Sequence, residues 1–456
     1  MIIRTSQLPG FYKVTIDERR SLISEATGIP PATMAAALDG GGLSAETADK
    51  FVENVLGTYA LPYGVTLNVR VNGQDHVAPM VVEEPSVVAA ASNAAKMVRA
   101  GGGFQVEVDP PIMISQIQVI RVKDRAAAAR AILADKAKLL ELADAAVPGL
   151  VARGGGARDI EVRELGEPAD EMIVVHILVD CRDAMGANLI NTIAESVADR
   201  IARLAAGAVG LRILSNLCDR RCVRVRCKVP ASVLATDQMD GSAVIDGVVN
   251  ASRFAELDPY RAATHNKGIM NGVDAVVIAT GNDWRAVEAG AHAFAARSGR
   301  YAPLSIWRRD GDTLTGFLEL PLALGTVGGT LRVHPSARLS LDVIGVADAA
   351  GLASVAASVG LASNLAALRA LATDGIQRGH MALHARSVAL AAGAAGPEVE
   401  RIAELIVEAR NITIEAARRA LSILRSSEEL PRSEEHPTAA GLAEDARPGG
   451  RTIAGS

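Results

Sequence analysis

The segment between about Ile112 and Asn216 limits the possible folds more than any other part of this sequence. Its hydrophobic pattern switches several times between the two-residue period of strands and the longer period of helices. Strands are predicted over 114–122, 160–165, 172–179 and 209–214, and helices over 124–143 and 187–204. The succession strand, helix, strand, strand, helix, strand is that of a ferredoxin-like unit.

The sequence on either side of this unit does not complete a core by itself, so the unit is predicted to be inserted into a larger domain that resumes near Cys218. After Asp374 the pattern is helical, and near the end Glu, Pro and Gly replace large apolar residues, which is typical of disordered tails. The expected class is α+β, with a large, mainly helical, discontinuous domain. The predicted parts are 1–110 and 218–374 for this large domain, 111–217 for the ferredoxin-like unit, 375–425 for a helical segment and 426–456 for a disordered tail.

Three further patterns predict elements of the large domain. Apolar residues at helical spacing over 48–56, with Ser44 as the cap and Gly57 at the end, predict an amphipathic helix. Asn72-Gly73 between two strand-like runs predicts a hairpin. The uncharged run 349–368 is rich in Ala, Gly and Ser, which favours a buried, closely packed helix pair over a membrane span.

Composition and charge exclude several classes of protein. The 456 residues include 47 Lys plus Arg and 52 Asp plus Glu, and the net charge of −5 with interspersed signs disfavours nucleic-acid or anionic-membrane binding. Aromatic residues make up only 3% of the chain, so a core of Ala, Val, Ile and Leu is expected, as in a layered enzyme. The N-terminal segment has no targeting pattern and the four cysteines suit a reducing compartment, which predicts a cytoplasmic protein. Their spacing is not a zinc pattern, and no metal site is expected.

An acidic pair follows the strand-like run 77–82. Glu83 and Glu84 precede an Ala-rich helix, whose positive N-terminal end favours a carboxylate. The structural interpretation is one helix-start charge beside a solvated neighbour. The functional interpretation is a buried carboxyl group with a raised pKa, which donates a proton at neutral pH. The sequence does not distinguish which of the two is buried.

Polar residues gather around Lys267 in the segment 258–272, DPYRAATHNKGIMNG. Pro259 and two glycines in this segment indicate non-regular backbone. So many polar groups in an apolar chain favour a site for an anion or a carbonyl group, and a polar surface loop is the alternative. The polar neighbours of the lysine are Arg261, His265, Asn266 and Asn271.

Asp283 lies between a predicted short strand over 276–280 and a predicted helix that begins at Trp284. One interpretation is that its carboxylate caps the helix, which is the commoner role of Asp at such a position. The other is that it pairs with Lys267, because a neighbouring carboxylate favours the ammonium form of lysine.

His380 and His384 are expected on one face of a helix, one turn apart. Met381 stands where the zinc-binding pattern HExxH requires Glu, so a zinc site is not predicted. A structural histidine is the simpler interpretation. Histidine is nevertheless the side chain best suited to protonate a leaving group near neutral pH.

Two glycine-containing turns do not match a Rossmann fingerprint. The turn 154–156 precedes a strand, and the turn 183–188, DAMGAN, lacks the G-x-G-x-x-G spacing. The second turn still follows a strand and leads into a helix. Its backbone N–H groups are therefore expected at a helix N-terminus, where they can bind phosphate on a different fold.

Seven longer strings carry a more specific signal than these single motifs. They are ENVLGT at 53–58, VVEEPSVVAAAS at 81–92, RDAMGANLINT at 182–192, RILSNL at 212–217, DPYRAATHNKGIMNG at 258–272, ATGNDWRAVEAGAHA at 279–293 and DGIQRGHMALHAR at 374–386. In this order they resemble the class II, soluble bacterial type of 3-hydroxy-3-methylglutaryl-coenzyme A (HMG-CoA) reductase, from about residue 7 to about residue 425. The resemblance implies interconversion of HMG-CoA with mevalonate plus CoA, by two successive hydride transfers with NAD(P)(H) through an intermediate at the level of mevaldehyde.

Matched by motif, the resemblance assigns the catalytic residues Glu84, Lys267, Asp283 and His380. It implies that Lys267 stabilises the oxygen that gains charge on hydride attack and that Asp283 holds and tunes this lysine. His380 is expected to protonate the departing thiolate, and Glu84 to supply a proton when the aldehyde is reduced. The implied substrate-binding residues are Ser86, Arg261 and Asn271, of which the arginine suits a carboxylate.

The resemblance further implies that the ferredoxin-like domain binds the nicotinamide cofactor. The matching residues are Asp183, Met185, Gly186, Asn188, Asn216 and Gly328. It also implies a homodimer, or a hexamer built from dimers, with active sites shared between subunits. The segment 375–425 is expected to be a mobile C-terminal helical flap that carries His380, with Gly375 and Gly379 as hinge positions.

The choice between NADH and NADPH depends on the residues before the string 154–156. Some NAD-preferring relatives have there an aspartate that binds the ribose hydroxyls and repels a 2′-phosphate. Val147 stands at about that position here, so charge does not exclude NADPH, and Arg153 is available to accept its phosphate. Asp144 can serve NAD if the loop is shifted. A slight preference for NADH is expected from the overall likeness to degradative members.

Two other functions use the same residues differently. A Schiff-base enzyme would use Lys267 as its nucleophile, and nothing else in the chain supports that chemistry. A non-catalytic sensing protein would use the ferredoxin-like unit to bind a small molecule. The reductase accounts for far more of the sequence than either alternative.

Overall fold

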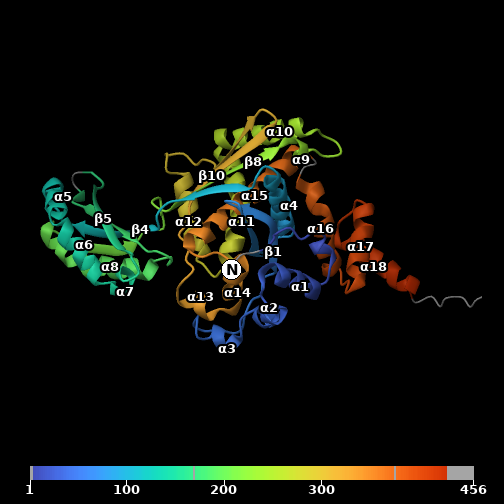
Figure 1. The fold of residues 1–456 in the computed structure, drawn as a ribbon, viewed down its shortest axis with the longest axis horizontal. Helices are drawn as coiled ribbons and strands as arrows, with labels where there is room; N and C mark the ends of the chain where they lie inside the picture. Colours follow the sequence, from blue (N-terminus) through green and yellow to red (C-terminus); the bar gives the residue numbers. More distant parts are fainter. Residues whose placement is uncertain (1–3, 168–169, 374–375, 429–456) are drawn as a thin grey trace, which may run out of the picture. The chain divides into compact units, whose positions relative to one another are not determined.

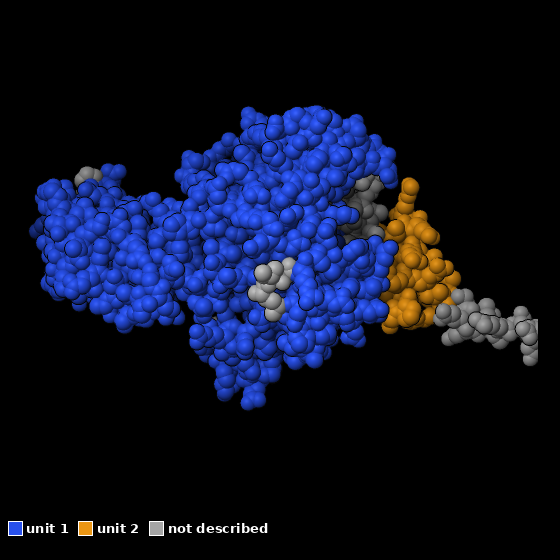
Figure 2. All heavy atoms as spheres, in the orientation of Figure 1, with its two compact units in different colours: residues 1–380 blue, residues 381–456 orange. Residues whose placement is uncertain are grey.

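The structure is a computed structural model, and it describes residues 4–167, 170–373 and 376–428. The chain divides into two compact units, Met1–His380 and Met381–Ser456, which Figure 2 draws in different colours. The first unit holds both sheets and the helices that cover them, and the second consists of helices in its described residues.

A six-stranded sheet forms the centre of the first unit (Figure 1), with the order β2-β1-β3-β8-β10-β9. Its strands are β1 (Tyr63–Val71), β2 (Gln74–Val81), β3 (Phe104–Val108), β8 (Cys222–Pro230), β9 (Ser305–Asp310) and β10 (Thr313–Pro321). The predicted hairpin is confirmed, because β1 and β2 pair in antiparallel fashion around Asn72 and Gly73. Both turn residues have positive φ, at 48° and 84°, as a tight two-residue hairpin turn requires.

Long helices pack on this sheet and supply the rest of the core. They are α4 (Val87–Ala100), α10 (Gly241–Leu257), α11 (Pro259–Ala279), α12 (Trp284–Ala295) and α15 (Ala349–Ala372). The segment 349–368, predicted to be a buried helix pair, is buried as expected but forms one continuous helix, α15. Within the described residues only this helix is long and apolar enough to cross a membrane, and 83% of its apolar window is buried inside the protein, as in a core helix.

The segment around Lys267 is helical, which corrects two predictions. The residues 258–272 are not a loop and 276–280 are not a strand, because α11 runs unbroken from Pro259 to Ala279. Pro259 occupies the first turn, where its missing N–H costs nothing. Gly272 lies where α11 packs against α15. A Cβ at this position would lie 2.5 Å from Ser363 Oγ, so the absence of a side chain permits the close packing of the two helices.

The predicted amphipathic helix over 48–56 is wrong. Ser44 does cap a helix, by accepting a hydrogen bond from Thr47 N, but α3 (Ala45–Ala48) ends after one turn. Val52 and Leu56 are then 60% and 105% exposed, so these two side chains do not pack against an apolar surface of the described residues, whereas Ala48 is buried. The remaining helical elements of the large domain are η1 (Phe11–Lys13), α1 (Ile16–Thr27), α2 (Pro31–Leu38), η2 (Asp39–Gly41), α9 (Ala231–Leu234), α13 (Gly329–Val333) and α14 (Pro335–Ile344).

The inserted segment forms its own four-stranded sheet, which confirms the ferredoxin-like order. The antiparallel strands β4 (Ile112–Ile120), β5 (Gly156–Glu164), β6 (Ile173–Asp180) and β7 (Ala208–Leu214) lie in the order β5-β6-β4-β7. Its helices are α5 (Arg125–Ala134), α6 (Lys136–Ala145), α7 (Pro148–Val151) and α8 (Ala187–Leu204). The single helix predicted over 124–143 is two helices, because the backbone leaves the helix at Asp135.

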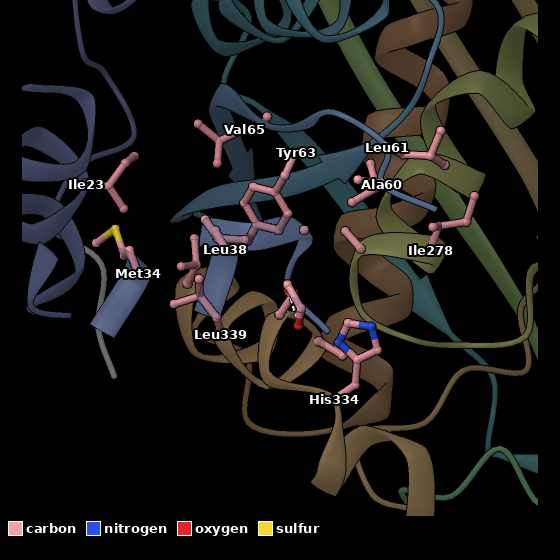
Figure 3. A pocket seen from close by; sticks show the side chains of 18 of the residues that line it. Ile23, Met34, Leu38, Ala60, Leu61, Tyr63, Val65, Ile278, His334 and Leu339 are labelled. Carbon is pink, nitrogen blue, oxygen red and sulfur yellow. Dashed lines mark hydrogen bonds between the residues drawn. The ribbon is translucent and has the colours of Figure 1, made fainter. Parts of the chain in front are cut away.

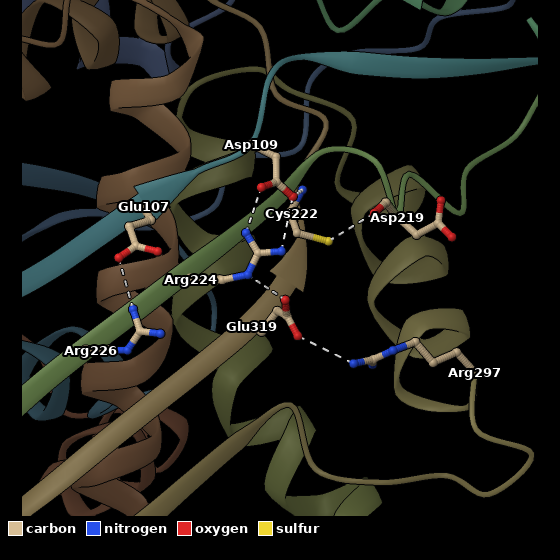
Figure 4. A network of polar contacts seen from close by, with 8 residues as sticks. All are labelled: Glu107, Asp109, Asp219, Cys222, Arg224, Arg226, Arg297 and Glu319. Atoms are coloured by element: carbon tan, nitrogen blue, oxygen red, sulfur yellow. Dashed lines mark hydrogen bonds and ion pairs between the residues drawn. The ribbon is translucent and has the colours of Figure 1, made fainter. Parts of the chain in front are cut away.

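A row of charged side chains crosses the central sheet (Figure 4). Arg224 on β8 lies 2.7 Å from Asp109 and 2.8 Å from Glu319, and Arg297 reaches the same glutamate at 3.5 Å. The carboxylates hold the guanidinium of Arg224 in its charged form and raise its pKa further. These contacts link neighbouring strands side chain to side chain, which is the ordinary way in which a sheet surface is stabilised.

The helices α16 (Ile376–Ala391), α17 (Pro397–Glu408) and α18 (Ile414–Glu428) form the C-terminal segment. Residues of all three pack into one apolar cluster, which includes Ala385, Ile402 and Leu421. The helix α18 continues beyond 426, where the disordered tail was predicted to begin. The rest of that predicted tail, 429–456, lies outside the described residues.

Candidate active site

An ion pair joins the two polar segments that the sequence singles out. Lys267, near the middle of α11, places its Nζ 2.6 Å from Oε2 of Glu84, in the turn between β2 and α4. The side chain of Glu84 is 38% exposed, whereas Glu83 is an exposed residue, so Glu84 is the more buried member of the acidic pair. The lysine side chain is 60% exposed. The pair therefore combines an ammonium and a carboxylate at a position that solvent and a substrate can reach.

Polar groups without a partner lie near this ion pair in the sequence. Ser86 precedes α4 with a φ of 77°, and its Oγ is buried without a hydrogen bond among the described residues. Arg261, six residues before Lys267 on α11, has no ion pair in the described part of the chain, and burial lowers its pKa. Asn271 follows Lys267 by one helical turn and is half-buried. A hydroxyl and a guanidinium left without partners are suited to a carboxylate ligand.

The two residues before Lys267 point into the core instead. His265 is 1% exposed and its Nε2 lies 2.7 Å from Ser305 Oγ, while burial lowers its pKa to about 4. Asn266 accepts a hydrogen bond from Leu304 N at 2.9 Å and donates one to Ala302 O at 3.0 Å. These residues hold α11 against the chain before β9, so they fix the helix that presents the lysine rather than binding a ligand.

Asp283 caps α12, which confirms the first of its two interpretations. Its Oδ1 accepts a hydrogen bond from Ala286 N at 3.1 Å and lies 3.6 Å from Arg285. Among the described residues, the amine of Lys267 contacts Glu84, and no ion pair joins it to Asp283. The sequence reasoning missed the Glu84–Lys267 contact because the two residues come from segments that only the fold brings together.

The turn 183–186 leads into the 18-residue helix α8 without a side-chain cap, so backbone N–H groups remain available for an anion. Gly186 has a φ of 107°, and a Cβ there would lie 2.6 Å from Cys181 Sγ, so only glycine fits. Met185 is half-buried, while Asn188, Asn216 and Gly328 are exposed. These features fit the phosphates of a dinucleotide. Asp183 is tied to the large domain, because its Oδ1 accepts a hydrogen bond from Ala349 N at 3.1 Å.

The structure describes each of the three residues that the sequence analysis related to the choice between NADH and NADPH. Val147 is 5% exposed and packs in the core of the inserted domain. Asp144 accepts a hydrogen bond from Ala157 N at 2.7 Å, so its carboxylate holds the start of β5. Arg153 is exposed, and none of the described residues forms an ion pair with it. The remaining free charge in this loop is therefore positive.

A cavity of about 650 Å³ lies among the segments that carry the motifs (Figure 3). Leu61 lines it shortly after the ENVLGT string, Val81 just before the EEPS string and Gly281 just before Asp283. Most of the other lining residues are apolar. The Nδ1 atom of His334 is buried without a partner among the described residues, and burial lowers the pKa of this histidine. This cavity was not predicted from the sequence, because its walls come from widely separated segments.

The remaining predicted site residues lie on α16 or just before it. The backbone of Gly379 and His380 belongs to this helix, whereas the side chain of His380 and all of Gly375 lie outside the described residues. His384 is exposed. In the described part of the chain no three His, Cys, Asp or Glu side chains gather as metal ligands would.

A partly exposed ammonium–carboxylate pair, in a chain whose inserted domain has an uncapped helix N-terminus, fits a carbonyl oxidoreductase. The profile of the hydroxymethylglutaryl-coenzyme A reductase family matches residues 15–385. The chain belongs to this family, and it is therefore an NAD(P)-dependent oxidoreductase that converts HMG-CoA to mevalonate.

Similar proteins agree in family and in fold. A 3-hydroxy-3-methylglutaryl-coenzyme A reductase of Archaeoglobus fulgidus is 47% identical over 423 residues, which cover 92% of this chain and 95% of the relative. A probable reductase of Borreliella burgdorferi is 36% identical over 74% of this chain and 77% of the relative. A Streptococcus pneumoniae reductase structure superposes with a TM-score of 0.78 at 43% identity, over 92% of this chain and 100% of that one. A class II structure from the same organism, described as bound to NADPH in open conformations, gives a TM-score of 0.77 at 43% identity, over 80% of this chain and 100% of that chain.

Proposed function

We propose that the Glu84–Lys267 pair is the reaction centre for both reductions. The observation that carries this proposal is the 2.6 Å contact between the two side chains, at a position where both remain partly exposed. The nicotinamide cofactor supplies a hydride in each of the two reductions. Lys267 stabilises the negative oxygen that forms when the thioester carbonyl carbon gains the first hydride, because an ammonium placed at a developing charge lowers the energy of the transition state.

Two protons balance the two hydrides. When the C–S bond breaks, the oxygen re-forms a carbonyl group and the CoA thiolate leaves, and His380 protonates this thiolate. After the second hydride reaches the aldehyde carbon, Glu84 supplies the proton that turns the oxygen into the hydroxyl of mevalonate. Asp283 holds and tunes Lys267. The match of GNDW to the family motif supports this role, whereas among the described residues the Asp283 carboxylate caps α12 and forms no ion pair with Lys267.

Ser86, Arg261 and Asn271 bind the substrate in this proposal. The unpartnered guanidinium and the buried hydroxyl support a site for the free carboxylate of the hydroxymethylglutaryl group. The cofactor lies against the turn 183–188, with Asn216 and Gly328 beside it. The proposed domain division is the one predicted from the sequence, with 111–217 as the cofactor-binding domain and 375–425 as the flap that brings His380 to the substrate. No metal takes part.

We propose that NADH or NADPH serves as cofactor, with NADH slightly favoured. The engaged carboxylate of Asp144 and the free charge of Arg153 support acceptance of a 2′-phosphate. Replacing Arg153 with Glu is expected to lower kcat/KM for NADPH roughly tenfold relative to NADH, because like charges repel at close range. Arg153→Gln, which removes the charge without reversing it, is the control. Its ratio of kcat/KM for NADPH to kcat/KM for NADH is expected to lie between those of wild type and Arg153→Glu. An unchanged ratio of the two kcat/KM values in Arg153→Glu would contradict the assignment.

The protein acts in the cytoplasm as a homodimer, or as a hexamer built from dimers, with shared active sites. The exposed apolar residues Val52 and Leu56 in and beside the ENVLGT string support a subunit contact there. The direct test of the activity follows the absorbance of NADH and NADPH with purified protein and HMG-CoA. Oxidation of either cofactor that depends on HMG-CoA is the expected result. No turnover with HMG-CoA, and none with mevalonate, CoA and the oxidised cofactors, would contradict the proposal.

A further inference from the structure

Arg221, just before β8, is an unusual arginine. It is 3% exposed, and none of the described carboxylates lies within ion-pair distance of it. Its guanidinium donates instead to backbone carbonyl oxygens, at 3.2 Å to Ala184, 3.5 Å to Met185 and 2.5 Å to Leu324. Two of these belong to the turn that leads into α8, and the third belongs to the segment after β10. The arginine therefore joins the inserted domain to the large domain.

The segment 322–327 also touches the same turn through its own backbone. Thr326 N donates to Asp183 O at 2.9 Å, and Val327 forms an isolated bridge with Ala184. A Cβ on Gly325 would lie 2.7 Å from Met185 N, so the two backbones meet without room for a side chain. The position of the turn 183–186 is thus fixed relative to the segment 322–327.

The other side of this segment is tied to the turn that carries Asp283. Gly325 N donates to Asn282 Oδ1 at 2.8 Å, and Asn282 Nδ2 donates to Gly325 O at 3.1 Å. This pair of bonds satisfies both backbone groups of Gly325 with one amide side chain. One short segment therefore connects the turn at the cofactor site with the turn at the catalytic site.

We propose that Arg221 and Asn282 are positioning residues, which fix the cofactor turn 183–186 and the catalytic turn 281–283 to the shared segment 322–327 and so set the nicotinamide against the substrate. This inference rests on the proposed function. It follows from the planar fork of arginine, whose several donors reach three carbonyl groups at once. A buried charge adds little to the free energy of unfolding, because the cost of removing it from water offsets the gain from its hydrogen bonds. Such a charge is suited instead to specifying one local arrangement of the backbone.

The test compares Arg221→Met and Arg221→Lys with Arg220→Met. Arg220 is the matched control, because it is the neighbouring arginine, 51% exposed and paired with Glu161 at 3.0 Å. NADPH binding is measured by fluorescence titration without substrate, and kcat, both KM values and the isotope effect with deuterated cofactor are measured in turnover. Arg221→Met is expected to weaken NADPH binding at least tenfold and to lower kcat, with KM for HMG-CoA within twofold of wild type. The NADPH affinity and kcat of Arg221→Lys are expected to lie between those of Arg221→Met and wild type. Both values in Arg220→Met are expected to match wild type.

Asn282→Ala provides a second test should Arg221→Met fail to fold. Because Arg221 still holds the cofactor turn in this variant, NADPH binding is expected to stay within twofold while kcat falls and the isotope effect rises. Wild-type binding and kinetics in folded Arg221→Lys and Asn282→Ala would overturn the inference, as would a change in melting temperature alone. A wild-type protein without turnover would instead contradict the proposed function. Because the fluorescence titration measures NADPH binding without substrate, it tests the inference about Arg221 even when no turnover is observed.

Discussion

The two sides of the active site are built in different ways. On the acyl side, Glu84 and Lys267 present charged atoms that are partly exposed, and Ser86 presents a hydroxyl without a partner among the described residues. On the cofactor side, three charged side chains are directed at backbone groups, namely Asp144 at Ala157 N, Asp183 at Ala349 N and Arg221 at three carbonyl oxygens, while Arg153 is exposed. In the proposed function, side-chain chemistry acts on the acyl side, whereas on the cofactor side the shape of the backbone acts together with the charge of Arg153. Substitutions on the two sides should change different kinetic constants.

The largest expected effect is on the acyl side. Lys267→Ala is expected to lower kcat by roughly 10³-fold, because it removes the charge that stabilises the oxyanion. NADPH affinity is expected to remain within twofold of wild type. Lys96→Ala, at an exposed lysine of α4, is the control and should leave both values unchanged. A Lys267→Ala variant that keeps more than about one tenth of wild-type kcat, against the roughly 10³-fold loss expected, would break the distinction between the two sides.

A smaller effect is expected on the cofactor side from Gly186→Ala. The added methyl group meets Cys181 Sγ in a backbone conformation that only glycine adopts easily, so the turn must move. The dissociation constant of NADPH is expected to rise roughly tenfold, about 1.4 kcal/mol, with KM for HMG-CoA unchanged. Gly311→Ala is the matched control, since Gly311 also has a positive φ of 57° but no atom within 4 Å of an added Cβ. Equal NADPH affinity in the two variants would show that the shape of the turn does not matter.

The remaining prediction concerns stability beneath the acyl side rather than a kinetic or binding constant. His265 has a folded pKa of about 4, below its unfolded value near 6.5, so between these pH values the unfolded state binds a proton that the folded state does not. The free energy of unfolding should therefore fall on acidification, with a contribution from this group of about 1.4 kcal/mol per pH unit. Denaturant titrations of His265→Gln at several pH values should show a shallower decline than wild type. Exposed His384→Gln should decline as wild type does, and parallel curves for all three proteins would contradict this assignment.

The sequence predicted the inserted domain well because its elements carry local signals. Each strand is a short run of apolar residues and the helix α8 has a regular apolar period, and the succession of these elements along the chain predicted the ferredoxin-like order. The helix α5–α6 was predicted at nearly the right place, but its break at Asp135 was not. The local sequence pattern is therefore sufficient to predict the fold where each element packs against elements that are close to it in the chain.

The errors lie where distant segments decide the structure. Gly268 and Gly272 suggested a loop, yet α11 is helical because small residues allow α15 to approach it closely. The apolar residues over 48–56 suggested a helix, yet α3 ends at Ala48 and the side chains of Val52 and Leu56 are exposed. Lys267 was expected beside Asp283 and instead contacts Glu84. None of these contacts has a signature within a short window of sequence.

The motifs identified the site residues, whereas their arrangement needed the fold. Glu84 and Lys267 are 183 positions apart in the chain, and only the packing of α4 and α11 on the same sheet brings them to 2.6 Å. The inward direction of His265 and Asn266 also could not be predicted, because in the sequence they are as polar as their neighbours. Burial separates the residues that support the helix from those that face a ligand.

The most direct test of the central claim counts the products of complete turnover. Purified protein is incubated with limiting HMG-CoA and excess NADPH, and oxidised cofactor, free CoA thiol and mevalonate are measured together. A site that performs both reductions before releasing its product must oxidise two cofactor molecules for each thiol released and each mevalonate formed. One cofactor oxidised per thiol, with an aldehyde as the product, or release of thiol without oxidation of the cofactor, would contradict the account.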